Sequence, residues 1–457
     1  MSIARPQGAI ADYFDRLRVG STYRSVKRAA KNMMHHIPGG SILKGMSHRM
    51  TEMLKDAIFE DSWFEHFGLI SVGPIDGHDL PSLIEMLLEV REVDRPLLLH
   101  AHTIKGKGFE YAENDATTFH SPKPFEIRNT CIEMQPSGRS FTAAFSDHLC
   151  ELMSSDDRIV AATAGMPDGT GIDKAIERFP NRVWDTGICE SHTLGMLAGM
   201  AKTGCIPFFA VYSTFLQRAF DQAFQEVTLQ GLPVRLCLDR AGVVGGDGPV
   251  HHGFCDIAIL RVLPDTVLMA AIDEESLKAA MTFMSSYDEG LSAVRYPRDT
   301  VQQLDLDCPP FALGESHQLR CCDDPRLAIL GYGTTALAAI EAADRVDPNV
   351  IEVYDARFAK PVDGRLIEDL LNKGIPIITV EDHSVIGGFG ASVIDEASNR
   401  KLDTTLITKL GLPDRWISHG TRKEQLAEAG IDVAGIASIA TRILSESEVD
   451  ATLVATP

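Results

Sequence analysis

Long apolar stretches are missing from this sequence. No run of 18 apolar residues occurs in its 457 residues, and the N-terminal segment MSIARPQGAIADYFDRL has no apolar core of signal-peptide length. A membrane-spanning helix needs about 20 predominantly apolar residues, and a secretory leader needs a shorter apolar core. We therefore expect a protein that neither spans a membrane nor is exported.

Paired cysteines are missing as well. The nine cysteines are an odd number and include no Cys-x-x-Cys pair, which fits neither a disulfide framework nor a zinc ribbon. His251, His252 and Cys255 lie close together, but no further ligand stands at zinc-like spacing. We expect a cytoplasmic protein without a zinc site.

Positive charge is in short supply. The 43 Lys and Arg residues stand against 64 Asp and Glu residues, a formal net charge of −21, and no long block of basic residues occurs. Such a chain would repel a nucleic-acid backbone or an anionic membrane, so we expect neither as a partner. A few arginines that converge in one pocket could still bind an anionic substrate.

The first part of the chain has too few strands for a complete domain. Helical spacing with basic residues covers residues 8–60, and two short apolar strands, 69–72 and 96–102, flank a helix over 79–93. Two strands cannot make a doubly wound sheet. We interpret residues 1–125 as the remnant of a domain.

The rest of the sequence alternates between strands and helices. Apolar strands at 159–163, 208–212 and 234–238 alternate with helical stretches in a module over 126–310. A third module over 311–457 repeats the pattern with the strands LAILGYG, VIEVYDARF and PIITVEDHS and a GGFG turn that opens a helix. This alternation predicts parallel sheets, hence an α/β chain with two doubly wound domains after the partial one.

Two segments place reactive side chains next to predicted strand ends. Glu190 stands just before the small-residue helix LGMLAGMA, although a carboxylate in a helix's first turn is also explained by the helix dipole. The segment Tyr212–Gln222 puts aromatics and Arg218 at the strand edge where open α/β sheets bind ligands. Aromatics at a strand end are more often part of the core.

A glycine-rich turn concentrates titratable groups. The segments DRAG (239–242) and GGDGPVHHG (245–253) hold two Asp, one Arg and two His. That concentration in a loop indicates a site better than packing does. The segment RYPR ends a predicted strand, and its arginines, Arg295 and Arg298, could bind a phosphate or form a surface charge pair.

Nine ordered segments resemble 1-deoxy-D-xylulose-5-phosphate synthases, and chance cannot supply so many in order. They are GPIDGHD, KGKGFE, TFH, the Glu190 segment, YSTFLQRAFDQ, DRAGVVGGDGPVHHG, SAVRYPR, VEDHSVIGGFG and GLPDRWISHG. The resemblance implies a transketolase-like fold, with a partial diphosphate-binding domain followed by pyrimidine-binding and C-terminal domains. It also implies a homodimer.

The resemblance implies thiamine diphosphate as cofactor. Glu190 matches the carboxylate that hydrogen-bonds N1′ of the aminopyrimidine, and Phe215 matches the aromatic that packs on that ring. Phe109 stands where the family usually has a cofactor-contacting Tyr, and Ile188 falls within the same cofactor site.

The resemblance further implies pyruvate and glyceraldehyde 3-phosphate as substrates. Arg240 and Arg298 match phosphate-binding arginines, Tyr212 and Asp247 match acceptor-site groups, and Arg218 lies beside them. The family has two histidines that handle protons near the reacting carbon, a task that suits imidazole. Their counterparts here are His120 and His251.

The metal motif of the family is not found. Its members bind Mg²⁺ through Gly-Asp-Gly and an Asn roughly 25 to 30 residues later. The single Gly-Asp-Gly here, residues 246–248, lies in the substrate loop, and no Asn occurs between it and Asn349. We therefore expect the Mg²⁺ ligands outside this chain and weak cofactor binding by the chain alone. A misassigned start, a partner chain with the missing domain, or an inactive relative would each explain this.

Three other functions stay open. A split transketolase and a β-type subunit of a 2-oxoacid dehydrogenase also pair pyrimidine and C-terminal domains with a partner chain. GPIDGHD and KGKG argue against the β-type subunit, while the DRAG loop and RYPR favour the synthase over transketolase. The third is a non-catalytic relative that has lost cofactor binding.

Overall fold

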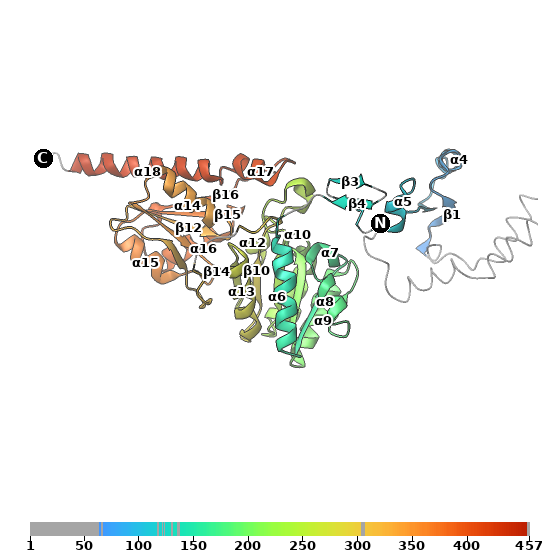
Figure 1. Ribbon diagram of the computed structural model, residues 1–457, viewed down its shortest axis with the longest axis horizontal. Helices are drawn as coiled ribbons and strands as arrows, with labels where there is room; N and C mark the ends of the chain where they lie inside the picture. Colours follow the sequence, from blue (N-terminus) through green and yellow to red (C-terminus); the bar gives the residue numbers. More distant parts are fainter. Residues whose placement is uncertain are drawn as a thin grey trace, which may run out of the picture. The chain divides into compact units, whose positions relative to one another are not determined.

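The structure consists of two units that are described separately. A computed structural model describes residue 64 and residues 67–116, 118–120, 122, 124–128, 131–134, 138–302 and 307–454, without the side chains at 134 and 447–454. The units are Ile3–Gln135 and Pro136–Pro457 (Figure 1). The helix predicted over 8–60 lies outside the described residues. No helix in the described part of the chain is long and apolar enough to cross a membrane.

The first unit contains the predicted strand, helix and strand. Strands β1 (Ile70–Asp76) and β2 (Leu97–His102) pair in parallel, and α4 (Leu80–Val90) connects them. Helix α4 begins after Asp79, whose carboxylate accepts a hydrogen bond from the Ser82 N–H. Further along are α5 (Glu110–Asn114) and the antiparallel pair β3 (Phe125–Arg128) and β4 (Cys131–Met134).

Helix α4 has an apolar face that is open to solvent. Leu80, Ile84, Leu87 and Leu88 follow helical spacing, and their exposed fractions run from 48 to 61%. Monomeric domains bury such a face against another layer. No layer that covers it is present among the described residues of this unit.

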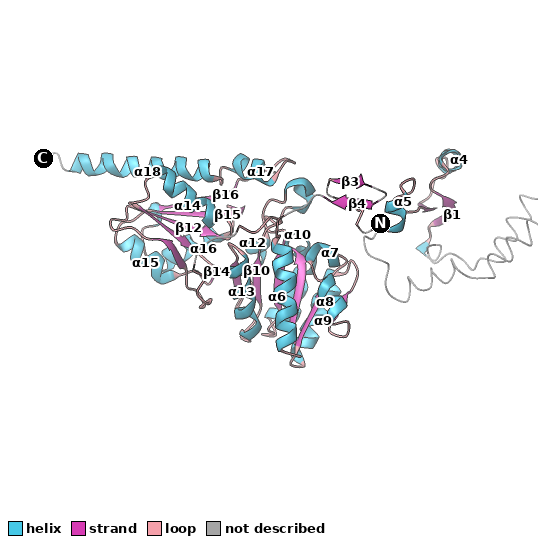
Figure 2. Ribbon diagram, in the orientation of Figure 1, coloured by secondary structure: helices cyan, strands magenta, loops and turns pink. Residues whose placement is uncertain are grey.

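The second unit begins with a seven-stranded sheet in its described part (Figure 2). The strand order is β14-β9-β10-β8-β7-β5-β6, and all neighbours are parallel except β14 and β9. The strands are β5 (Ile159–Thr163), β6 (Val183–Asp185), β7 (Ile206–Tyr212), β8 (Arg235–Asp239), β9 (Val267–Ala270), β10 (Ser292–Arg295) and β14 (Phe358–Lys360). The three strands predicted for this module are confirmed as β5, β7 and β8.

The five central strands of this sheet are buried along their whole length, as in sheets that helices cover. Two of the longer helices begin at side-chain caps: Ser140 caps α6, and Asp273 and Ser276 form a capping box in α13. The helices of this part of the chain are α6 (Phe141–Ser155), α7 (Pro167–Thr170), α8 (Asp173–Arg178), α9 (Glu190–Lys202), α10 (Ser213–Leu216), α11 (Phe220–Gln222), α12 (Asp256–Arg261) and α13 (Glu274–Ser286).

The C-terminal part forms a second sheet, of five strands in the described region. Its order is β11-β13-β12-β15-β16, and only β11 is antiparallel to its neighbour. Its elements are β11 (His317–Arg320), β12 (Leu327–Tyr332), β13 (Ile351–Asp355), β15 (Ile377–Ser384), β16 (Ile407–Leu412), α14 (Thr335–Val346), α15 (Gly364–Asn372), α16 (Phe389–Asn399), α17 (Arg422–Ala429) and α18 (Val433–Val454). The GGFG turn opens α16, as predicted.

One predicted strand is wrong in its extent. VIEVYDARF was expected to be continuous, but β13 ends at Asp355 and Phe358 starts β14 in the other sheet. The chain turns at Arg357, which has a φ of 55° and whose guanidinium donates to the carbonyls of Pro309 and Pro310. The C-terminal part thus contributes β14 to the seven-stranded sheet, which joins the two sheets.

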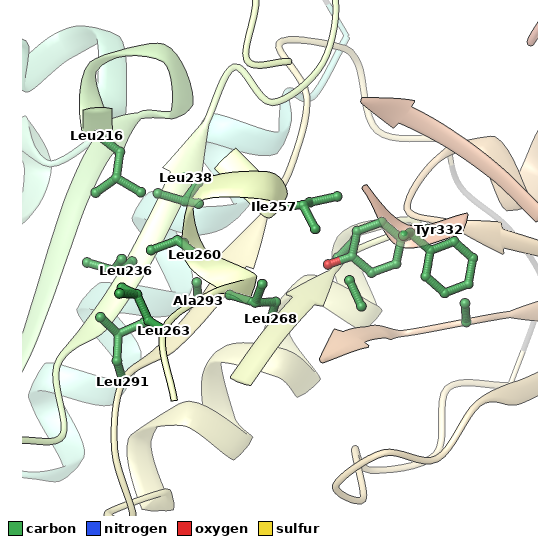
Figure 3. Packing of buried hydrophobic residues seen from close by; sticks show 14 of the residues in the cluster. Leu216, Leu236, Leu238, Ile257, Leu260, Leu263, Leu268, Leu291, Ala293 and Tyr332 are labelled. Carbon is green, nitrogen blue, oxygen red and sulfur yellow. The ribbon is translucent and has the colours of Figure 1, made fainter. Parts of the chain in front are cut away.

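The two sheets also share a hydrophobic core. Leu238 of β8, Ile257 of α12 and Tyr332 of β12 belong to one buried cluster (Figure 3). Tyr332 stacks on Phe389 with ring centroids 5.1 Å apart. Because apolar side chains of both sheets are removed from water together, the pyrimidine and C-terminal modules form a single unit.

A buried carboxyl on β15 gives the stability of this unit a pH dependence. Glu381 is fully buried and accepts hydrogen bonds from the N–H groups of Phe389 and Gly390, at 2.5 and 2.9 Å. Burial raises the pKa of Glu381 from 4.5 to about 7, against the opposing effect of these hydrogen bonds and of Arg295 and Lys409.

We expect the free energy of unfolding to fall as pH rises from about 4.5 to 7, because the unfolded chain then loses this proton first. The loss is roughly 3 kcal/mol. Denaturant unfolding of the wild type and of Glu381→Gln across this range measures it as the difference between the two proteins. Parallel pH curves would contradict the assignment.

Candidate active site

Three parallel strands bring their carboxyl ends to one edge of the seven-stranded sheet. Tyr212 ends β7 and lies opposite Asp239, the last residue of β8. The chain leaves β5 toward β6 on one side and β7 toward β8 on the other. Ligands of open α/β sheets bind where the strand order diverges in this way. The candidate residues of the second unit gather at this edge.

Glu190 opens α9 and is held by one arginine. Its side chain is 4% exposed, and its Oε1 lies 3.1 Å from Nη1 of Arg218. The Ser191 hydroxyl donates to the Arg218 carbonyl at 2.6 Å. The first turn of α9 therefore contacts both the guanidinium and the backbone carbonyl of Arg218. The sequence predicts Arg218 beside the substrate-binding residues and does not pair it with Glu190.

An aromatic stack lies next to this pair. Phe215 stacks on Tyr212 with ring centroids 5.6 Å apart, and the Arg218 guanidinium lies 5.3 Å from the centroid of Phe215. The ring of His251 meets Phe215 edge-on at 5.7 Å. Phe215 thus links the carboxylate side of the site to the glycine-rich turn.

Arg240 is turned inward beneath Tyr212. Its guanidinium lies 4.0 Å from the Tyr212 ring centroid, is 3.0 Å from the Asp239 carboxylate and donates to the Gly169 carbonyl. Its φ of 59° is unusual for a residue with a side chain and costs roughly 1–3 kcal/mol. Such strain persists only where surrounding contacts fix it, and it clusters at functional sites.

Burial shifts two protonation equilibria here. Burial raises the pKa of Tyr212 to about 12, so its hydroxyl stays a hydrogen-bond donor. Burial also raises the pKa of Asp239, although Arg240 and the Thr142 hydroxyl, at 2.8 Å, act in the opposite direction. Asp239 lies in the predicted DRAG segment but received no role there, because its position at a strand end gave no sign of complete burial.

The glycine-rich turn joins the remaining predicted residues. Arg298 Nη1 lies 2.8 Å from the Asp247 carboxylate, and the Asp247 carbonyl lies 3.1 Å from Nδ1 of His251. The side chain of Arg298 is 41% exposed, whereas that of Arg240 is 11% exposed. Arg298 is therefore the arginine that is more open to a ligand.

Ile188 lies at the open end of the site. Its side chain is 59% exposed and lies beside Gly165, where a Cβ would come within 2.9 Å of Ile188 Cγ1. The Asp185 carboxylate accepts hydrogen bonds from the N–H groups of Gly165 and Gly187, at 2.7 and 3.0 Å. Asp185 thus fixes the two turns around Ile188.

Two predicted residues belong to the first unit. Phe109 is half-buried against Phe119 and Phe125, with ring centroids 5.5 and 6.2 Å away, and His120 is exposed. Glu190 and His251 belong to the second unit. The proximity of Phe109 and His120 to these two residues therefore stays a prediction. In the described part of the chain, no group of three or more His, Cys, Asp or Glu side chains could hold a metal ion.

Three family descriptions match successive parts of the chain. They are 1-deoxy-D-xylulose-5-phosphate synthase over residues 1–103, the transketolase pyrimidine binding domain over residues 137–303, and the transketolase C-terminal domain over residues 317–436. The matches follow the chain in the order that the sequence predicts for a transketolase-like fold.

Similar full sequences carry the same description. A 1-deoxy-D-xylulose-5-phosphate synthase from Methylobacillus flagellatus is 38% identical over 441 residues, which cover 95% of this chain and 70% of the relative. Another, from Geobacter sulfurreducens, is 38% identical over 451 residues, or 97% of this chain and 70% of the relative.

Solved structures share the fold. A "Split gene transketolase, inactive beta4 tetramer" superposes with a TM-score of 0.59 at 25% identity, covering 68% of this chain and 99% of that chain. A transketolase from Leishmania mexicana superposes with a TM-score of 0.57 at 16% identity, covering 69% of this chain and 47% of the other. The second likeness concerns the fold alone.

Proposed function

This chain belongs to the 1-deoxy-D-xylulose-5-phosphate synthase family, and we propose that it serves the reaction named by that family. In this reaction pyruvate loses carbon dioxide, its remaining two carbons join glyceraldehyde 3-phosphate, and one proton is taken up. The fold is transketolase-like α/β, with synthase N-terminal, pyrimidine-binding and C-terminal parts.

The observation that carries this proposal is the continuity of the candidate site. The contacts run from Glu190 through Arg218 and Phe215 to Tyr212, and from Phe215 through His251 to Asp247. The two ends differ in chemistry, because one offers a buried carboxylate and the other offers arginines.

The carboxylate end fits the pyrimidine of thiamine diphosphate. The hydrogen bonds of the described residues use only Oε1 of Glu190, which leaves Oε2 for N1′, and the half-buried ring of Phe215 offers an apolar face to the pyrimidine. Ile188 and Phe109 complete the proposed cofactor contacts. When bound, thiamine diphosphate supplies the electron sink for decarboxylation.

The arginine end fits the phosphosugar. Arg298 can turn its planar fork toward a phosphate, whereas Arg240 contributes charge from beneath Tyr212. Asp247 and Tyr212 can bind the hydroxyl groups of the acceptor. We assign to His251 the proton that reaches the aldehyde oxygen as the carbon–carbon bond forms, and to His120 a second proton transfer near the same carbon.

We further propose that the Mg²⁺ ligands come from outside these 457 residues. The single Gly-Asp-Gly is engaged elsewhere, because the Asp247 carboxylate pairs with Arg298. The solvent-open apolar face of α4 supports a further layer over the first unit. That layer would come from a partner chain or from residues outside the described part of the unit. Homodimer formation and a cytoplasmic location stay predictions.

Carbon dioxide release from pyruvate tests the proposal. The full chain is assayed with thiamine diphosphate and Mg²⁺, alone and together with a polypeptide that carries the diphosphate motif. We expect release that depends on glyceraldehyde 3-phosphate, with 1-deoxy-D-xylulose 5-phosphate as product, in the combined sample. Release that is indifferent to the phosphosugar would speak for a different thiamine enzyme.

The second candidate function is that of a non-catalytic subunit that has lost cofactor binding. The solved structure "Split gene transketolase, inactive beta4 tetramer", of which this chain covers 99%, favours it. Calorimetry with thiamine diphosphate and Mg²⁺ separates the two candidates when the chain is combined with a polypeptide that carries the diphosphate motif. Tighter cofactor binding by the combined sample than by that polypeptide alone would refute the non-catalytic subunit, and unchanged binding would refute the proposed reaction.

A further inference from the structure

The glycine-rich turn is shaped from outside by the C-terminal module. We call residues 240–253 the glycine loop. Three of its glycines, Gly242, Gly245 and Gly248, have φ values of 77°, 67° and 75°. A Cβ at Gly242 would collide with the Asp382 carboxylate, one at Gly245 would lie 3.2 Å from the Arg422 nitrogen, and one at Gly248 would lie 3.1 Å from His419. Each glycine therefore marks a close approach by that module.

The same module binds the polar backbone groups of the loop. The Val243 N–H donates to Asp382 Oδ1 at 3.0 Å, and the Gly245 N–H donates to Gln425 Oε1 at 2.8 Å. Gln425 Nε2 donates back to the Gly245 carbonyl at 3.4 Å. His419 Nε2 lies 2.8 Å from the Gly246 carbonyl. We refer to Asp382, His419, Arg422 and Gln425 as the clamp residues.

Arg422 extends the clamp to the other side of the candidate phosphate site. Its guanidinium lies 2.8 Å from Asp382 and 2.9 Å from Asp299. Asp299 follows Arg298, whose side chain pairs with Asp247. Arg422 and Gln425 lie three residues apart in the first turn of α17, so they share one face of that helix. The capping box of Thr421 and Glu424 fixes where this turn begins.

A loop with so many glycines has a large conformational freedom when unbound. If nothing held the loop, a ligand would have to order it on binding. The free energy spent on ordering the loop would then be lost from the binding free energy of the ligand. Gln425 is 1% exposed and Asp382 is 4% exposed. Because these contacts are buried and directed at the loop backbone, they hold the loop without requiring a ligand.

We propose that the four clamp residues, Asp382, His419, Arg422 and Gln425, are positioning residues that keep the glycine loop in its ligand-binding shape, so that the C-terminal module sets the affinity for the phosphosugar. The assignment of the phosphosugar to this loop rests on the function proposed above. The clamp itself rests on the contacts alone.

The test compares three alanine variants of the full chain. Gln425→Ala removes the central clamp contact, and His419→Ala removes an exposed one that matters less for folding. The matched control is Gln318→Ala, in the same module, where the amide donates to Glu352 and Tyr354 and not to the loop. Gln425→Glu keeps the acceptor for the Gly245 N–H but replaces the amide that donates to the carbonyls of Gly245 and Ser418 with an acceptor oxygen, so it tests whether the donor is needed as well.

Hydrogen exchange of the loop amides and the dissociation constant of glycerol 3-phosphate are measured for each variant. We expect Gln425→Ala to speed exchange and weaken binding by about tenfold each. We expect a change of the same direction in Gln425→Glu, which loses the donor to two carbonyls, a smaller change in His419→Ala and no change in the control. Thermal unfolding identifies any variant that fails to fold. Should Gln425→Ala not fold, His419→Ala decides.

The outcomes separate the clamp from the function. Exchange that matches the control in both clamp variants overturns the clamp. Faster exchange with unchanged glycerol 3-phosphate affinity overturns its role in phosphosugar binding. Faster exchange in a series whose wild type binds no glycerol 3-phosphate supports the clamp and refutes the proposed function.

Discussion

Replacement of Glu190 by Gln is expected to lower turnover of the assembled enzyme by roughly 10²–10⁴-fold and to leave the chain folded. Glutamine keeps the shape of the side chain and an acceptor oxygen for Arg218, which lies 3.1 Å from Oε1. It removes the negative charge that, in the proposed cofactor site, favours a proton on the pyrimidine nitrogen. The measurement is kcat, together with the thermal unfolding temperature.

A matched substitution controls for the loss of one charge. Glu177 lies on α8 of the same module and is exposed, so Glu177→Gln should keep the turnover of the wild type. If Glu190→Gln turns over as fast as this control, the role of Glu190 is wrong. A Glu190→Gln variant that unfolds at a much lower temperature would instead indicate a structural role.

The strands of the core could be predicted because their sequence is locally consistent. Ile159–Thr163, Ile206–Tyr212 and Leu327–Tyr332 are fully buried strands, and buried strands of parallel sheets have nearly continuous apolar sequences. The turns after them carry glycines and polar residues, which is where α/β sheets place ligands. Pattern and fold agree in these segments.

Contacts between distant segments could not be predicted in this way. The Glu190–Arg218 pair spans 28 positions, and the Gly245–Gln425 contact spans 180. Neither leaves a periodic trace in the sequence. The break at Arg357 was missed for a related reason, because its positive φ is stabilised by the carbonyls of Pro309 and Pro310 and not by its neighbours in sequence.

The two arginines that we propose for phosphate binding show the same limit. Nothing in the sequence distinguishes Arg240 from Arg298, but their burial differs. Arg240 neutralises the fully buried Asp239, and removing one partner of a buried ion pair costs about 3–5 kcal/mol. Any loss of activity in Arg240→Ala would therefore combine misfolding with lost binding. Arg298 allows a cleaner test.

Arg298→Ala is expected to raise KM for glyceraldehyde 3-phosphate by roughly 10- to 100-fold, with a far smaller change in KM for pyruvate. The side chain is 41% exposed and pairs only with Asp247 among the described residues, so its removal leaves no buried charge unpaired. Arg298→Lys keeps the charge but loses the planar fork. Its KM for glyceraldehyde 3-phosphate should therefore lie between those of the wild type and Arg298→Ala.

Arg158→Ala is the matched control, because Arg158 is an exposed arginine of the same module that pairs with Asp156 at 2.7 Å. Surface pairs of this kind contribute about 0–1 kcal/mol, so this variant should keep both KM values. An equal rise of both KM values in Arg298→Ala would place Arg298 at a shared part of the site. An unchanged KM for the phosphosugar would leave Arg240 as the phosphate-binding arginine, since it is the other guanidinium that the site brings to this end.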